Sequence, residues 1–535
     1  MLRKVVTPVK AHKLETYLQG YDRVKSKTLV DGFRYGFRIN SFNFVPTKCG
    51  NNLISARQLP DVVDTKLGKD LKLGRYSGPF ISSPFKDFKI SPLGVREKKT
   101  PGKFRLIHNL SYPYDETSVN SSIPKDCATV KYATIVDAIQ LINYYGKNCF
   151  MAKTDVESAF RIIPVHPMDR HLLGFKWKNS FYFDNCLPMG CSSSCQLFEL
   201  FSTSLEWIIF QRLTGVGVIH VLDDFFFVAS TYDKCQSALN LFLHICEDIG
   251  VPISLEKTFG PSQAMPFVGI QLDSVSMEAS LPEDKVLKFT SLIDEIMSVK
   301  STTLKQVQSL TGMLNFACGI IAPARAFTRR LYDITIGIVK PFHHVKITKQ
   351  IKLDLQVWKN FMSNHNRKTF LLDYIWVSNE HLQLFTDAST TIGFGGYFQD
   401  KWFHGIWPVA CKGLNIALLE LYPICLALHL WGEQLTNKCI TINTDNMAIV
   451  YVLNNNTSKD PLIMLLVRKL VLLCMKLNIL IRAQHISTKL NTVSDMLSRD
   501  QIRKALQLAP HLQENPVTVP PQWTLVQWLA ELGSC

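Results

Sequence analysis

The chain lacks the cysteine patterns of a zinc site. Its 14 cysteines include no CxxC pair and no zinc-finger spacing. Cys186, Cys191 and Cys195 are close in sequence but have no histidine partner nearby. Thiolate zinc modules require such spacings, so this class of site is excluded. We expect reduced, mostly buried thiols, which are typical of intracellular proteins.

A signal peptide and a long uninterrupted apolar run are also missing. Residues 1–8 lack the apolar core of a signal peptide. The most hydrophobic stretch, Pro461 to Ile481, is interrupted by three basic residues and predicts an amphipathic helix followed by a strand. We therefore expect no export and no membrane partner, and a cytoplasmic or nuclear location.

The composition indicates a large basic protein. The 535 residues contain 59 Lys and Arg against 44 Asp and Glu, which gives a formal net charge of +15 and a pI of about 9.1. A hydrophobic content of 47% is ample for several domain cores. The charge suits a protein that follows a phosphate backbone.

Two adjacent acids stand inside an otherwise apolar run. Asp223 and Asp224 are flanked by Val221-Leu222 and by Phe225-Phe226-Phe227-Val228. Neighbouring carboxylates in an apolar setting repel each other, so they protonate, turn outward or bind a divalent cation. The β-rich flanks predict that this pair lies at the tip of a hairpin.

A third acid, Asp155, ends another apolar strand at Phe150 to Asp155. Three carboxylates delivered from two strand ends suit two Mg²⁺ ions roughly 4 Å apart, the arrangement used in phosphoryl transfer. Mn²⁺ is an alternative.

With these acids the chain resembles the reverse transcriptases. Asp155 matches the first catalytic aspartate of the polymerase palm, and Asp223 and Asp224 match the paired aspartates of the aromatic-x-Asp-Asp box, although Val221 replaces the aromatic residue. The resemblance implies that Phe160 lies under the sugar of the incoming nucleotide and excludes a 2′-hydroxyl. The implied substrate is a deoxynucleoside triphosphate.

Other segments of this family follow in order. The resemblance implies a fingers clamp for the triphosphate, a turn beneath the template and nucleotide, a palm lysine near the leaving pyrophosphate, and a primer grip. The corresponding residues are Lys98 and Arg105 for the clamp, Met189 and Gly190 for the turn, Lys257 for the palm lysine, and Phe267, Val268 and Gly269 for the grip.

The second half carries another set of acids. A predicted three-strand meander bears Asp387, a helix from Asn415 to Trp431 bears Glu420, a strand ends at Asp445, and a loop and helix bear His485 and Asp495. This order resembles ribonuclease H, whose four metal-binding acids match these four. The resemblance implies two Mg²⁺ ions, hydrolysis of RNA paired to DNA, and a mobile loop histidine at His485.

The resemblance extends over about residues 30 to 505 and is greatest to DIRS-type retrotransposons, which integrate by a tyrosine recombinase. It rests on the wording from Asp155 to Pro167, on Leu187-Pro188-Met189-Gly190-Cys191 and on Leu314 to Phe327. No aspartic protease box, integrase zinc module or recombinase catalytic set is recognisable. Separate recombinase and Gag-like chains are therefore possible partners.

These patterns predict an α+β multidomain chain, a right-hand polymerase followed by an α/β ribonuclease H-like domain. The expected parts are an N-terminal extension bracing the fingers (1–80), fingers and palm (81–275), thumb or connection helices (276–375), a ribonuclease H-like domain (380–505) and an extended Pro-containing tail (506–535).

The predicted function is to copy retroelement RNA into DNA and to degrade RNA in the hybrid, with RNA template, DNA primer, RNA–DNA hybrid and deoxynucleoside triphosphates as partners. Two alternatives stay open. One is a domesticated or decayed protein that binds nucleic acid without catalysis. The other is a gypsy-like or pararetroviral reverse transcriptase.

Overall fold

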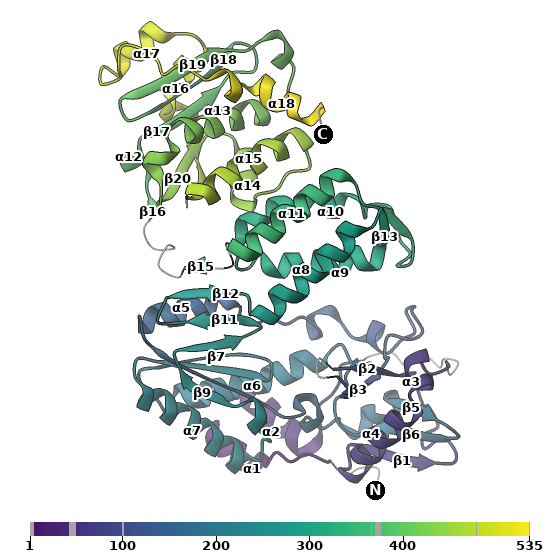
Figure 1. Ribbon diagram of the computed structural model, residues 1–535. Coiled ribbons are helices and arrows are strands. Elements are labelled where there is room, and N and C mark those ends of the chain that lie inside the picture. The colour runs from purple at the N-terminus through teal and green to yellow at the C-terminus, as the bar shows by residue number, and fades with distance from the viewer. Residues whose placement is uncertain are drawn as a thin grey trace. The chain divides into compact units, whose positions relative to one another are not determined.

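The computed structural model describes residues 5–41, 50–98, 101–364, 366, 368–369, 376–477 and 479–533. The chain divides into two compact units. Unit 1 holds residues 1–268 and 272–276, and unit 2 holds residues 269–271 and 277–535. Figure 1 shows both units, and each is described by itself below.

Unit 1 mixes helices with short sheets. Its helices are α1 (Ala11–Tyr17), α2 (Arg23–Tyr35), α3 (Ile54–Gln58), α4 (Pro60–Lys72), α5 (Ile135–Tyr145), α6 (Ser194–Phe210) and α7 (Tyr232–Ile249). Its strands are β1 (Tyr76–Phe80), β2 (Leu93–Glu97), β3 (Phe104–His108), β4 (Phe150–Asp155), β5 (Gly174–Trp177), β6 (Ser180–Asp184), β7 (Val216–Val221), β8 (Asp224–Ala229), β9 (Phe259–Ser262) and β10 (Ala264–Phe267).

The centre of unit 1 is a four-stranded antiparallel sheet in the order β7-β8-β4-β9. Strand β8 is buried along its whole length after Asp224, because Phe225, Phe226 and Phe227 fill both faces of the sheet. Helices α6 and α7 pack against these strands and close the core (Figure 1). A buried central sheet therefore delivers Asp155 and Asp224 from neighbouring strands.

A second core lies among the predicted fingers. Strands β2 and β3 form an antiparallel hairpin, and β1, β6 and β5 form a separate antiparallel sheet. Helices α3 and α4 contact β1, β2 and β3, and their apolar side chains share one cluster with Phe175 and Trp177. The hairpin is thus held at its base while its tip carries basic residues.

The N-terminal prediction holds only in part. Residues 54–80 do pack against the predicted fingers. Helices α1 and α2 instead contact α7 and α6, and Leu14, Leu29 and Phe33 belong to the same core as β8. Their apolar faces are buried in the palm, so bracing of the fingers by this part was a wrong expectation.

Unit 2 begins with helices and continues with a mixed α/β fold. Its helices are α8 (Glu283–Ser298), α9 (Leu304–Ala317), α10 (Arg329–Asp333), α11 (Lys349–Asn364), α12 (Asn379–Leu382), α13 (Ile416–Trp431), α14 (Met447–Asn455), α15 (Pro461–Leu477), α16 (Thr492–Ser498), α17 (Ile502–Leu508) and α18 (Leu525–Gly533). Its strands are β12 (Glu278–Ser280), β13 (Ser301–Thr303), β14 (His344–Lys346), β15 (Lys368–Thr369), β16 (Trp376–Val377), β17 (Leu384–Ala388), β18 (Gly393–Phe398), β19 (Lys401–Ile406), β20 (Cys439–Thr444) and β21 (Leu480–His485). Strand β11 (Ile270–Asp273) lies at the boundary between the units.

The strands of unit 2 confirm the predicted meander. Strands β17, β18 and β19 are antiparallel, β16, β20 and β21 are parallel, and β17 lies beside β20. Helix α13 contacts β17, β18 and α15. Residues 416–435 are long and apolar enough to cross a membrane by length and composition alone, but 72% of that stretch is buried within the unit.

Helices α8 to α11 lie within residues 276–375, for which thumb or connection helices are a prediction. Helix α9 begins with a capping box in which Thr303 and Gln306 satisfy each other's backbone N–H groups. Asp354 of α11 forms an ion pair with Arg330 at 2.8 Å and another with Arg468 of α15 at 3.5 Å. The second pair links α11 to α15. Burial raises the pKa of Asp354 and lowers the pKa of Arg468.

The C-terminal segment is not the extended appendage that its prolines predicted. The Trp402 indole donates to the Gln513 carbonyl at 2.7 Å, and the Tyr422 hydroxyl donates to the Trp523 carbonyl at 3.1 Å. Trp528 on α18 is only 2% exposed and packs on Tyr422. Aromatic burial overrides the local breaking effect of proline here, so the segment is part of the packed fold of unit 2.

Candidate active sites

The first candidate site lies at one end of the central sheet of unit 1. In the register of β4 and β8, Asp155 is directly opposite Asp224. Strands β7 and β8 are joined by the loop Leu222-Asp223, so the predicted hairpin tip is confirmed. The Val156 N–H donates to the Asp223 carbonyl at 2.9 Å, which ties the loop to the end of β4. The structure therefore brings all three predicted acids together.

The carboxylates of this site repel one another in a buried setting. Burial raises the pKa of Asp223, and the neighbouring Asp155 carboxylate raises it further. Burial also raises the pKa of Asp224 to about 6, with Asp155 and Asp223 acting in the same direction and Lys153 opposing them. Lys257 donates to Asp155 Oδ2 at 2.7 Å. These three carboxylates attract cations, and the ammonium group of Lys257 already contacts Asp155.

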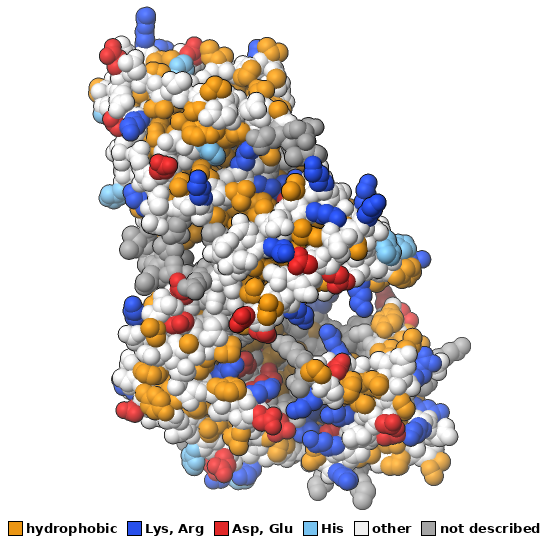
Figure 2. Space-filling view, viewed as in Figure 1, with side chains coloured by type: hydrophobic (Ala, Val, Ile, Leu, Met, Phe, Trp, Pro, Cys, Tyr) orange, Lys and Arg blue, Asp and Glu red, His pale blue; other side chains and the backbone are white. Residues whose placement is uncertain are grey.

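Arg105 of the β2–β3 hairpin acts electrostatically on Asp223, and Lys98 lies within electrostatic reach of Arg105 and Lys257. Lys98 follows β2 and Arg105 lies on β3. Partial burial lowers the pKa of Lys98, and the nearby positive charges of Arg105, Lys66 and Lys257 lower it further. Figure 2 shows Lys and Arg side chains gathered over β2, β3 and α4. This is the electrostatic setting that a triphosphate requires.

The remaining polymerase residues take varied positions. Phe160 packs edge-on against Phe198 of α6, with ring centroids 6.0 Å apart. The Met189 carbonyl accepts from the His108 N–H at 3.0 Å. Gly190 has φ +126°, and a Cβ there would lie 2.0 Å from the His108 carbonyl oxygen. Glycine at this turn is therefore required by sterics.

The predicted primer grip is a tight turn. Strand β10 ends at Phe267 and β11 begins at Ile270. Val268 and Gly269 between them both have positive φ, 47° and 77°. Phe267 is buried and stacks on Phe226 of β8, with ring centroids 4.5 Å apart. Phe267 is thereby anchored to the central sheet.

A buried charged network beneath the first site was missed by sequence reasoning. Asp184 is fully buried and forms ion pairs with Arg161 and with His108, whose Nδ1 lies 2.9 Å from the carboxylate. It links β3, β6 and the segment after Phe160. The signal was available, because Asp184 ends the apolar run Ser180–Asp184 just as Asp155 ends β4.

The second candidate site lies in unit 2. Asp387 is on β17, Glu420 on α13, Asp445 directly after β20, and Asp495 on α16. Burial raises the pKa of Asp387 to about 6, with Asp445 and Asp495 adding to the effect. Burial raises the pKa of Glu420 to about 7, with Asp445 and Asp387 adding to it. The four predicted acids therefore lie close enough for Asp445 and Asp495 to act electrostatically on Asp387, and for Asp445 and Asp387 to act on Glu420.

Most of these acids are held by protein donors. Ser498 donates to Asp387 at 2.6 Å, Thr488 donates to Asp445 at 2.9 Å, and Arg499 donates to Asp495 at 2.8 Å. Glu420 differs, because its Oε2 is buried and has no hydrogen-bond partner among the described residues. A buried carboxylate oxygen without a donor is costly unless a cation completes it.

His485 is placed differently from the expected mobile loop. It is the exposed last residue of β21 and pairs in register with Thr444, the residue before Asp445. The parallel ladder of β20 and β21 extends to this point, so the residue is in a strand. His485 nevertheless stands at the strand end next to the acids.

The donor chemistry of both sites fits Mg²⁺ or Mn²⁺, since every predicted ligand is a carboxylate and no thiolate takes part. In their present positions, the described carboxylates of neither site form a complete set of metal ligands. Among the described His, Cys, Asp and Glu side chains, no group of three or more could hold a metal ion as it stands. Protein donors occupy several of the carboxylates, most directly Lys257 at Asp155.

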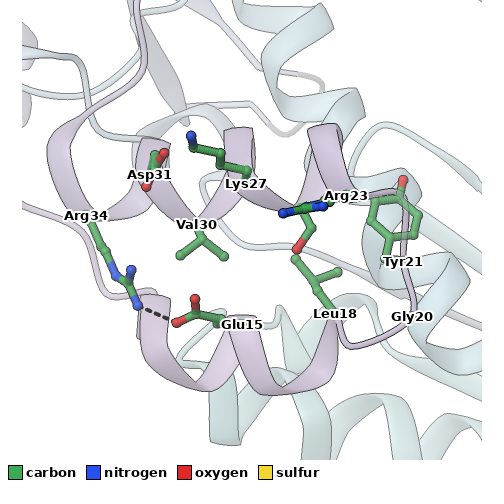
Figure 3. Close-up of a pocket in the computed structure, with 10 residues that line it drawn as sticks. Glu15, Leu18, Gly20, Tyr21, Arg23, Lys27, Val30, Asp31 and Arg34 are labelled. Atoms are coloured by element: carbon green, nitrogen blue, oxygen red, sulfur yellow. Dashed lines mark hydrogen bonds and ion pairs between the residues drawn. The ribbon is translucent and has the colours of Figure 1, made fainter.

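Two cavities lie away from both candidate sites. One, of about 320 Å³, is lined by α1 and α2 and includes the ion pair of Glu15 with Arg34 (Figure 3). The other, of about 380 Å³, lies between β19 and the C-terminal segment and includes Phe394 and Trp407. Neither cavity is lined by a predicted site residue.

Residues 97–272, which carry the first site, match the family model described as reverse transcriptase (RNA-dependent DNA polymerase). This segment is a reverse transcriptase domain. It is similar to polyproteins and polymerase proteins of several viruses. The Pro-Pol polyprotein of feline foamy virus is 25% identical over 257 residues, 46% of this chain and 21% of the relative. Protein P of duck hepatitis B virus (strain China) is 26% identical over 163 residues, 30% of this chain and 20% of the relative.

The chain also resembles a solved structure in fold. The foamy viral protease-reverse transcriptase in complex with double-stranded DNA matches with a TM-score of 0.50 and 15% identity, covering 90% of this chain and 83% of that chain. This likeness supports the α+β multidomain architecture. The chain spans about one fifth of the length of the two curated relatives.

Proposed function

We propose that this reverse transcriptase chain is an RNA-directed DNA polymerase that also carries a ribonuclease H activity. The observation that supports the first activity is the convergence of Asp155, Asp223 and Asp224 at one sheet end, facing Lys98 and Arg105. The observation that supports the second is the mutual electrostatic effect of Asp387, Glu420, Asp445 and Asp495.

In the polymerase site the three aspartates would hold two Mg²⁺ ions, which lower the charge of the reacting phosphate oxygens when bound. Lys98 and Arg105 bind the triphosphate and orient it. The primer 3′-hydroxyl loses its proton to water as its oxygen bonds to the α-phosphorus, and the bond to pyrophosphate breaks. Phe160, wedged against Phe198, closes the space beside the sugar and so selects deoxynucleotides.

In this scheme Lys257 first binds Asp155 and then moves to the departing pyrophosphate. It sits on Asp155 at 2.7 Å, with 60% of its side chain exposed. The Asp155 side chain is only 13% exposed, so Lys257 leaves it when a divalent cation takes the place of the ammonium beside the carboxylate. Once released, its ammonium donates a proton to the departing pyrophosphate.

In the ribonuclease H site the four carboxylates would hold the second pair of Mg²⁺ ions. Glu420 Oε2 is the free acceptor for one of them. Water attacks the RNA phosphodiester, the bond to the ribose 3′-oxygen breaks, and His485 receives or delivers a proton at the open edge of the site. The DNA strand of the hybrid is left uncut.

We further propose that the chain derives from a DIRS-type retrotransposon and works with separate recombinase and Gag-like chains. The motif wording around Asp155 and from Leu314 to Phe327 supports this origin. Sequencing of the flanking genomic locus tests it. An adjacent tyrosine recombinase reading frame is expected, and an adjacent integrase frame instead would contradict it.

The activities are tested in one reaction. Full-length protein is incubated with a DNA primer on an RNA template, deoxynucleotides and Mg²⁺, and both strands are followed. The double variant Asp223→Asn, Asp224→Asn should lose extension by roughly 10³-fold or more and keep template cleavage. The variant Glu420→Gln should show the reverse. Hybrid binding by folded wild-type protein without either reaction would favour the non-catalytic alternative.

A further inference from the structure

One face of helix α6 contacts the strand that leads into the Asp223-Asp224 loop. Glu199, Ser202 and Glu206 are spaced three and four residues apart and therefore share that face. Helix α6 packs against β7, and both belong to unit 1. None of these three residues is a candidate metal ligand, and none belongs to the predicted triphosphate-binding pair Lys98 and Arg105.

Ser202 holds the backbone of the loop itself. Leu222, the first loop residue, has φ +56°, a left-handed conformation that costs a residue with a side chain roughly 1–2 kcal/mol. The Ser202 hydroxyl, in a fully buried residue, donates to the Leu222 carbonyl at 2.8 Å. Strained residues persist where their surroundings hold them, and here a directional bond from α6 holds the residue before Asp223.

His220 links the same helix face to the strand. It is 6% exposed, its Nδ1 contacts Glu206, and its Nε2 lies 3.2 Å from Glu199 Oε1. Its ring stacks on Phe225 with centroids 5.3 Å apart, and Phe225 directly follows Asp224. The two carboxylates raise the pKa of His220 to about 9 against the opposing effect of burial. The imidazole is therefore positively charged at neutral pH.

An ionic contact of this kind is an unusual way to gain stability. Replacing a buried ion pair by apolar residues of similar size is often neutral or stabilising, because desolvation offsets the attraction. Directional bonds do, however, fix the relative position of two elements. His220 and Leu222 are the two points on the approach to Asp223 that α6 holds by polar contacts.

We propose that Glu199, Ser202 and Glu206 of α6, together with His220, form a clamp that sets the position of the Asp223-Asp224 loop for polymerisation. His220 is a positioning residue that acts through the loop. The proposal rests on the proposed polymerase function. It predicts that loss of the clamp displaces the two carboxylates while the fold and the second active site persist.

The test uses full-length protein with the variants His220→Phe and Ser202→Ala, and His244→Phe on the exposed face of α7 as the matched control. A misplacement near 1 Å lowers rates by up to about 10²-fold. We expect kcat for primer extension to fall roughly 10- to 100-fold in both clamp variants. KM for the deoxynucleotide and the rate of template cleavage should stay near wild type, and His244→Phe should behave as wild type.

The outcomes separate the two proposals. Wild-type kcat in both clamp variants would overturn the clamp and leave the polymerase function standing. No extension by folded wild type would overturn both. If His220→Phe loses extension and template cleavage together through misfolding, the isosteric variant Glu206→Gln decides. Extension reduced with cleavage retained supports the clamp, and unchanged extension refutes it.

Discussion

At the scale of single residues, Gly190 shows how backbone geometry constrains this site. Its φ of +126° and the 2.0 Å approach of a Cβ to His108 leave no room for a side chain. We expect Gly190→Ala to lower the free energy of unfolding by about 1–3 kcal/mol and to reduce extension. Urea unfolding with the extension assay measures both.

Gly68 on α4 is the control for this prediction. A Cβ there meets nothing within 4 Å and its φ is ordinary. Gly68→Ala should be neutral or stabilise the protein by about 0.4–1 kcal/mol. Equal effects of the two substitutions would refute the steric account of Gly190.

The pKa values of the acids in the second candidate site predict a pH-dependent response to Mg²⁺. Folding raises the pKa of Asp387 to about 6 and of Glu420 to about 7, from 3.8 and 4.5. Between the unfolded and the folded pKa of each acid, the folded state binds more protons than the unfolded state. The free energy of unfolding therefore falls as pH rises through this range. Above about pH 7 both acids are ionised and repel each other fully.

Mg²⁺ binding should relieve this repulsion. We expect the increase in Tm on adding Mg²⁺ to be larger at pH 8 than at pH 5.5, as measured by calorimetry. The double variant Asp387→Asn, Glu420→Gln should show a smaller difference between the two pH values. An equal Mg²⁺ effect at both pH values in wild type would contradict the proposed site.

At the scale of elements, the C-terminal segment stabilises the second half of unit 2. Trp528 is 2% exposed and packs on Tyr422 and His429. Removing a buried tryptophan side chain costs about 3–5 kcal/mol, so Trp528→Ala should lower the urea midpoint markedly. The control is Val526→Ala, whose side chain is 39% exposed and should have little effect. Similar midpoints for both variants would contradict a structural role for this segment.

Elements with a clear period were predictable. The run before Asp155, the hairpin around Asp223 and the helix bearing Glu420 were each predicted and are present as β4, β7–β8 and α13. Elements whose role depends on distant partners were not. The prolines after Leu508 and the isolated aromatics near Phe33 gave no hint that both segments would be buried in cores. The periodicity of a segment indicates whether it forms a helix or a strand. It does not show which other element its apolar face packs against.

At the scale of the whole molecule, the net charge of +15 predicts salt-dependent binding of nucleic acid. Protein contacts to phosphates release counterions, and a protein making several of them loses roughly 10³-fold or more in affinity between 50 and 200 mM salt. We expect this slope for an RNA–DNA hybrid in fluorescence anisotropy titrations. Lys98→Ala combined with Arg105→Ala should make the slope shallower. Salt-independent affinity would refute backbone recognition.

The sequence by itself determined the chemical identity of the candidate sites, since acids that end apolar strands are costly in any fold and so signal a cation site. It also determined the order of the two sites along the chain. Only the tertiary structure decided what surrounds those acids: Lys257 on Asp155, the orphaned oxygen of Glu420, and the contacts of α6 with His220 and Leu222. The reason is physical, because these contacts join residues that are distant in the chain or lie on different elements, and chain folding alone brings them within bonding distance.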